Sequence, residues 1–122
     1  MAAAVQDAGP RATSRLSYVE CGAAFARAGR ESRAPKAQIA STVEAFEDGW
    51  RDIAIVELDD LIARQAVAIT REHPLRASDA IHLASALAIA PPTGSVTFAC
   101  FDRRLWVAAG VLGLDRIPAS AP

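Results

Sequence analysis

The stretch SVTFACF, residues 95–101, with Asp102 directly after it, decides how this sequence folds. Its β-branched, aromatic and small apolar residues predict a short buried strand, and the residues from Arg103 to Leu112 predict a helix that stops at Gly113. An acidic residue between strand and helix lies at the carboxyl end of the strand. In an open parallel sheet that edge carries the functional site, so Asp102 is the first candidate functional residue.

Strands and helices alternate along the rest of the chain as well. The pattern predicts the tail of a helix over 2–8, a weak strand over 11–14, helices over 18–29 and 35–50, a strand over 53–58, helices over 60–72 and 79–90, and a last edge strand over 116–118. Alternation of this kind indicates βαβ units, and therefore an α/β fold with a mostly parallel sheet and helices on both of its faces.

Helix ends and apolar faces can also be predicted. Ser17 with Glu20 has the spacing of a capping box, and Ser78 and Asp59 or Asp60 are suitable caps for later helices. Two helices are expected to turn apolar side chains inward at helical spacing. These inward residues are Ile39, Val43, Phe46 and Trp50 in one helix, and Leu61, Ile62, Ala66 and Ile69 in another.

Composition limits the function classes. The 122 residues are 52% hydrophobic, which suits one folded domain, and we place it at residues 1–118 with a tail over 119–122. The formal net charge of −1 argues against broad electrostatic binding of nucleic acid, but leaves a metal-bridged contact open. Cys21 and Cys100 show no zinc-type spacing, so we expect reduced thiols in the cytoplasm. The longest apolar stretch, residues 80–92, is too short to span a bilayer, so we expect no membrane segment.

Three carboxylates stand out at predicted junctions. Glu20 and Asp79 lie in the first turns of helices, and Asp102 follows a strand. A doubly wound fold can bring all three to one rim of the sheet. Carboxylates that gather there repel one another unless a hard divalent cation such as Mg²⁺ binds between them, and such an ion can activate water and stabilise charge on a phosphate.

Structural interpretations compete with this one. An acid in the first turn of a helix is common for capping and dipole reasons alone, and Asp102 could be only a helix N-cap. His82, one turn after Asp79, is favoured as a half-buried, hydrogen-bonded histidine over a metal ligand. Cys21 has no evident partner base, so it is favoured as a small buried side chain. The three arginines Arg76, Arg103 and Arg104 fit a phosphate-binding patch and solvated surface charge about equally.

Taken together, three stretches resemble a known family. TSRLSYVECGAAFARAGR (13–30), LRASDAIHLASALAIA (75–90) and VTFACFDRRLWVAAGVLGL (96–114) are similar, in order and interval, to the later acidic motifs of PIN-domain proteins. The closest subfamily is the VapC-type toxin, the ribonuclease of bacterial toxin–antitoxin pairs. The resemblance covers about residues 1–118 and implies a three-layer α/β/α fold.

The resemblance also implies an activity. It is that of a Mg²⁺- or Mn²⁺-dependent endoribonuclease, in which Glu20, Asp79 and Asp102 match the metal-binding acids and Ser17 matches a supporting hydroxyl near the site. His82 would support the site as well, and Arg76, Arg103 and Arg104 would contact RNA. Family toxins commonly form homodimers and are blocked by a cognate antitoxin.

One family motif is not found. The family pattern opens with a strand followed by an Asp, a principal metal ligand, and nothing here matches it; Asp7 lies in the wrong context. A sheet without that central strand would leave unpaired edges, which dimerisation or a strand from a partner could cover. We favour the interpretation that the natural protein starts further upstream.

Three function classes therefore remain. The first is a toxin-type ribonuclease, and the second is a PIN-like domain that binds an antitoxin or RNA without cleaving it. The third is a structural α/β domain in which Glu20, Asp79 and Asp102 are ordinary helix caps. Loss of metal-dependent cleavage in Asp79→Asn would support the first class.

Overall fold

The computed structural model describes residues 9–92 and 94–122. Its elements are β1 (Ala12–Ser14), α2 (Leu16–Arg30), α3 (Lys36–Trp50), β2 (Ala54–Val56), α4 (Asp60–Glu72), α5 (Ala77–Ala88), β3 (Thr97–Ala99), α6 (Arg103–Val111) and β4 (Asp115–Ile117). This order confirms the predicted strands and helices to within a few residues. The helix tail predicted over 2–8 lies outside the described residues.

The strands form two separate parallel pairs. In one pair β1 lies beside β2, with Thr13 opposite Ile55, and in the other β3 lies beside β4, with Phe98 opposite Arg116. No hydrogen bonds join the two pairs within the described residues, so each of them is a two-stranded sheet. Among the described residues, the expected single sheet is therefore divided into two parts.

The apolar core lies among the last three helices. Leu83 is fully buried on α5, between Ile62 and Ile69 of α4 and Leu105 of α6 in the same cluster. Many other core residues are alanines, which allow the helix backbones to approach closely. Gly113, with φ of 85°, makes the left-handed turn that leads from α6 into β4.

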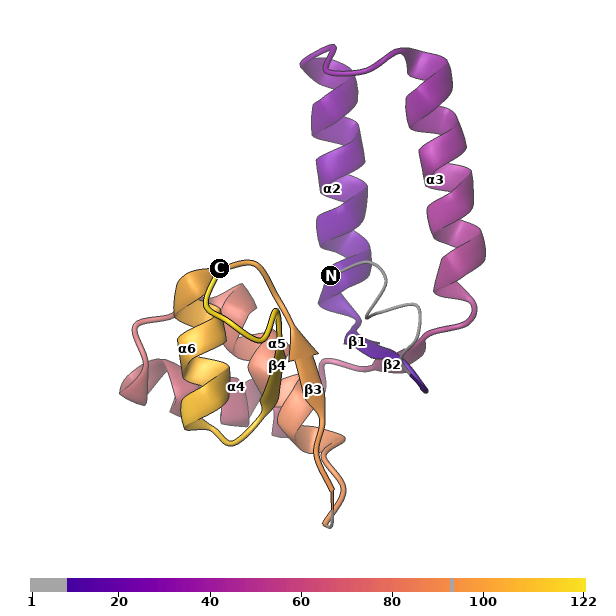
Figure 1. The fold of residues 1–122 in the computed structure, drawn as a ribbon. Coiled ribbons are helices and arrows are strands. Elements are labelled where there is room, and N and C mark those ends of the chain that lie inside the picture. Colours follow the sequence, from indigo (N-terminus) through magenta and orange to yellow (C-terminus); the bar gives the residue numbers. More distant parts are fainter. Residues whose placement is uncertain (1–8, 93) are drawn as a thin grey trace.

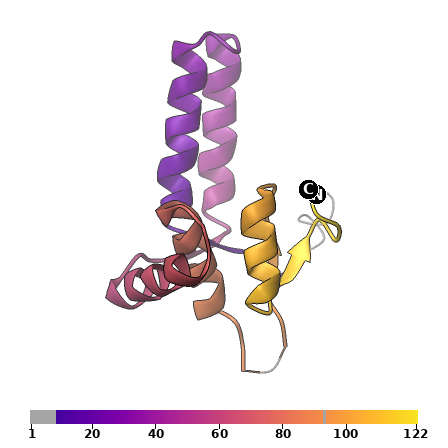
Figure 2. The same ribbon diagram turned by 90° about the vertical axis from the view of Figure 1, so that its left-hand side faces the viewer.

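Helices α2 and α3 form a long hairpin that projects away from this core (Figures 1 and 2). Neither helix has a buried residue. The hairpin joins the rest of the chain through β1 and β2, and Arg15 and Glu57 form a bidentate ion pair across that junction. Among the described helices, none is both long and apolar enough to cross a membrane.

Two predicted caps are wrong. Helix α2 starts before Ser17, because the buried Ser14 hydroxyl accepts a hydrogen bond from the N–H of Leu16 at 3.3 Å and the chain turns there. The capping box with Glu20 is therefore absent. Helix α5 starts before Ser78, because the carbonyl of Arg76 already accepts from the N–H of Ala80 at 3.0 Å.

The other predictions for α4 are mixed. Asp59 is its N-cap, as expected, and accepts from the N–H of Ile62 at 2.9 Å. Leu61, however, is 69% exposed and does not face inward. The buried face of α4 is narrow and consists of Ile62, Ala66 and Ile69. Leu61 lies about 100° away from that face around the helix.

Candidate functional site

Glu20 and His82 join the hairpin to the core. Glu20 is in the second turn of α2, and its Oε2 lies 2.8 Å from Nε2 of His82 on α5. The Glu20 side chain is 47% exposed and the His82 side chain 18% exposed. His82 is thus a half-buried, hydrogen-bonded histidine, and the bond fixes the direction of the Glu20 carboxylate.

Asp79 lies one turn before His82 on the same helix. Its Oδ2 accepts from Nε of Arg76 at 3.3 Å, and its side chain is only 16% exposed, whereas that of Arg76 is 80% exposed. Because residues three apart on a helix are neighbours, the Asp79 carboxylate and the Glu20–His82 pair occupy the same end of α5.

Asp102 caps α6. Its Oδ1 accepts from the N–H of Leu105 at 3.0 Å. That backbone hydrogen bond holds the pKa of the Asp102 carboxyl below its usual value, helped by a second one from Arg104 and by the charges of Arg76 and Arg104. Asp102 is therefore the N-cap of α6, as the structural interpretation of this residue predicts.

Cys100 follows β3 and lies two residues before Asp102. Burial raises the pKa of the Cys100 thiol, and the negative charges of Asp102 and, more weakly, Asp79 raise it further. Burial also raises the pKa of Cys21, so neither thiol is activated as a nucleophile.

Ser17 lies at the start of α2, where β1 ends. Its Oγ is 2.7 Å from Oγ1 of Thr13, and both residues are half-buried. The two hydroxyls form a small polar pair on the same helix as Glu20. Thr13 was not predicted as part of the site. A hydroxyl residue in the strand, four residues before Ser17, is the feature that could have indicated it.

Glu20, Asp79 and Asp102 are called the carboxylate rim below. Their carboxylate oxygens are the kind of ligand that a hard divalent cation prefers. The geometry is less complete. Over residues 9–92 and 94–122, no three His, Cys, Asp or Glu side chains come close enough together to form a metal-binding group. One oxygen of each of two carboxylates is already engaged, Oε2 of Glu20 by His82 and Oδ2 of Asp79 by Arg76.

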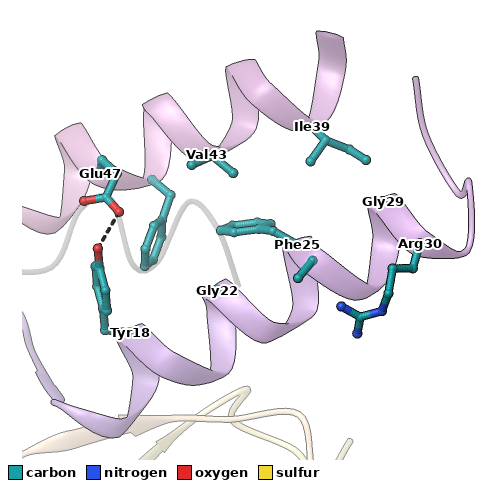
Figure 3. A pocket seen from close by; sticks show the side chains of 10 residues that line it. Tyr18, Gly22, Phe25, Gly29, Arg30, Ile39, Val43 and Glu47 are labelled. Atoms are coloured by element: carbon teal, nitrogen blue, oxygen red, sulfur yellow. Dashed lines mark hydrogen bonds between the residues drawn. The ribbon is translucent and has the colours of Figure 1, made fainter. Parts of the chain in front are cut away.

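A groove in the hairpin is a feature that no motif predicted. The groove lies between α2 and α3 and has a volume of about 590 Å³. Figure 3 shows Phe25, Val43 and Ile39 along it. Tyr18 donates a hydrogen bond to Glu47 at 2.6 Å. Phe46 packs against Tyr18 and Phe25, with ring centroids 5.7 and 5.4 Å apart. The signal was a second apolar face on α2, through Tyr18, Gly22, Phe25 and Gly29 at helical spacing.

Comparisons with known proteins give a consistent result. The sequence model of the PIN domain matches residues 1–106. Two curated relatives, "Ribonuclease VapC45" and "Ribonuclease VapC49", both from strains of Mycobacterium tuberculosis, are each 38% identical over 107 residues. Those residues are 88% of this chain and 73% of each relative. No solved structure matches the chain.

Proposed function

Because the chain belongs to the PIN-domain family, whose fold is a three-layer α/β/α arrangement, we propose that it is a cytoplasmic endoribonuclease of a toxin–antitoxin pair. The relatives carry the name ribonuclease, which supports cleavage of RNA phosphodiester bonds. The single observation that carries the proposal is the 2.8 Å contact of Glu20 with His82 on α5, the helix that also carries Asp79.

The proposal assigns roles to these side chains. Glu20, Asp79 and Asp102 would hold Mg²⁺ or Mn²⁺, which supplies an activated water and stabilises charge on the phosphate. His82 directs the Glu20 carboxylate through the 2.8 Å contact. The hydroxyl pair of Thr13 and Ser17 supports the start of the helix that carries Glu20.

Residues 1–118 are proposed as one domain whose sheet is completed by a further strand. The separation of β1–β2 from β3–β4 supports this proposal. A strand from the same polypeptide or from a partner would pair with both edges and would bring a fourth carboxylate if it carried the family's opening Asp.

The test is cleavage of total cellular RNA by this chain with Mn²⁺ and with EDTA. The variant is Asp79→Asn, and the matched control is Asp60→Asn, an exposed acid of α4 that pairs only with Arg64. We expect Mn²⁺-dependent cleavage that Asp79→Asn lowers at least 100-fold and Asp60→Asn leaves unchanged, with identical circular dichroism spectra. A folded chain that cuts no RNA with Mn²⁺ would contradict the proposal.

A second candidate function is binding without cleavage. The observation that favours it is the open apolar groove of the hairpin, which offers contact area to an antitoxin or to a second copy in a homodimer. Its signature would be a stable complex with the cognate antitoxin, seen by size-exclusion chromatography, for a chain that does not cut RNA.

A further inference from the structure

A second, smaller groove lies between the α4–α5 connection and α6. Its volume is about 260 Å³, and its lining combines apolar and basic groups. The side chains that matter are His73, Pro74 and Leu75 on one wall, and Arg103, Arg104 and Val107 on the other. Pockets that enclose whole small molecules measure roughly 300–1,000 Å³, so this groove suits one unit of a longer ligand.

Six arginines form an ion pair with a carboxylate, whereas Arg103 and Arg104 belong to the six that form none within the described residues. Arg15, Arg51, Arg64 and Arg76 each form an ion pair with a carboxylate. Within the described part of the chain, Arg103 and Arg104 have no carboxylate within ion-pair distance, and both are exposed. In a chain of net charge −1, this local positive charge is complementary to an anionic ligand.

Both walls of the groove are adjacent in sequence to residues that carry or contact the candidate carboxylates. Arg103 follows Asp102 directly, and the wall of His73, Pro74 and Leu75 continues into Arg76, which holds Asp79. Arg104 lies two residues after Asp102, in the first turn of the helix that this carboxylate caps. A polymer seated in the groove would therefore pass the candidate site.

We propose that this groove binds one nucleotide of single-stranded RNA next to the phosphate at the carboxylate rim. Arg103 and Arg104 contact its phosphates, and the base lies against His73, Pro74 and Val107. Phosphate contacts position a nucleic acid, and stacking on a ring gives affinity that tolerates any base. The inference rests on the proposed ribonuclease function and adds the path of the substrate.

The experiment measures binding separately from cleavage. Fluorescence anisotropy of a labelled single-stranded oligoribonucleotide is recorded in EDTA at several salt concentrations for the chain, Arg103→Ala/Arg104→Ala, His73→Ala and the control Arg51→Ala. Arg51 is a distant arginine that pairs with Asp48. Cleavage of the same RNA with Mn²⁺ is measured in parallel, and circular dichroism checks that each variant folds.

We expect the double arginine variant to bind at least tenfold more weakly. Its plot of log affinity against log salt should be shallower by about 0.7 for each phosphate that the two arginines neutralise in the unmodified chain. His73→Ala should weaken binding several-fold, because it removes a ring on which a base can stack. Arg51→Ala should behave as the unmodified chain does.

The outcomes separate the two proposals. If the chain binds and cuts RNA while the double arginine variant keeps its affinity and slope, the groove is not the path and the ribonuclease function stands. If His73→Ala binds normally, the base does not lie in the groove. If the unmodified folded chain neither binds nor cuts RNA, both proposals fail. Equal affinity for the matching DNA strand would overturn the assignment to RNA.

Discussion

The hairpin of α2 and α3 and the unit of α4, α5 and α6 differ in how they use apolar residues. Every buried hydrophobic residue in the described parts of the chain belongs to the second region or to Leu114 just after it. The hairpin has more aromatic rings, in Tyr18, Phe25, Phe46 and Trp50, yet leaves all of them half-buried or exposed around an open groove.

The two regions therefore have different expected roles, one in stabilising the fold and the other in binding partners. Burial of apolar surface is the main stabilising term, so the alanine-rich second region should hold the fold together. The hairpin buries little and presents large rings to its surroundings, which is typical of surfaces that bind partners. The carboxylate rim lies between the two regions, where Glu20 of α2 meets His82 of α5.

The sharpest test of this contrast is Leu83→Ala. Leu83 is the largest fully buried side chain among the described residues, and shortening it leaves a cavity in the core. We expect the free energy of unfolding, from urea denaturation, to fall by about 2–5 kcal/mol. Leu61→Ala, at a 69% exposed position of α4, is the control and should change it by less than about 0.5 kcal/mol. A similar loss in both variants would contradict the assignment of the core.

A smaller effect is expected in the hairpin from Phe46→Ala. Phe46 contacts the rings of Tyr18, Phe25 and Trp50, but the cluster faces solvent on one side. We expect a loss of about 1–2 kcal/mol, since a half-buried ring loses less than the full amount on truncation. Phe101→Ala, at a ring that is 72% exposed, is the control. A loss as large as that of Leu83→Ala would show that the hairpin belongs to the core.

The smallest effect concerns acid stability where α6 begins. The pKa of Asp102 is lowered in the folded chain, chiefly by the hydrogen bond from Leu105, from an ordinary value of 3.8. The unfolded chain therefore binds this proton first, so the charge stabilises the fold above that ordinary value. This contribution is lost as the pH falls through the lower, folded-state pKa.

Asp102→Asn isolates that charge, because an asparagine can still cap the helix. We expect the variant to be slightly less stable than the unmodified chain at neutral pH and equally stable once the pH is below the lowered pKa. Urea midpoints measured across this pH range check the sign. A gap that widens in acid would mean that the pKa of Asp102 is raised in the folded chain.

Much of the fold was predictable because it follows local patterns. The strand before Asp102 and the helix over 36–50 came from runs and periodicity, which depend only on neighbours in the chain. The caps at Ser17 and Ser78 were wrong because competing groups decided where those helices start. In the first case the decisive group was the hydroxyl of Ser14, which competes with Ser17 by accepting a hydrogen bond from the nearby N–H of Leu16.

The candidate site was predictable as a set of residues but not as a geometry. The sequence indicated Glu20, Asp79 and Asp102, and the structure places them on α2, on α5 and at the N-cap of α6. Their present partners, His82, Arg76 and the N–H of Leu105, come mostly from packing between elements. Whether the carboxylates converge on an ion depends on those contacts and on the separation of the two strand pairs.

The two tryptophans are divided between the two regions, with Trp50 at the end of the hairpin and Trp106 on α6. Trp106 donates to the carbonyl of Pro118 at 2.8 Å and lies beneath the guanidinium of Arg116, 3.6 Å from the ring centroid, whereas Trp50 packs on Tyr18 and Phe46. A chain with either indole replaced by phenylalanine therefore carries one intrinsic fluorophore in one region. Emission from such single-tryptophan chains would report separately when the hairpin meets a partner and when the core opens.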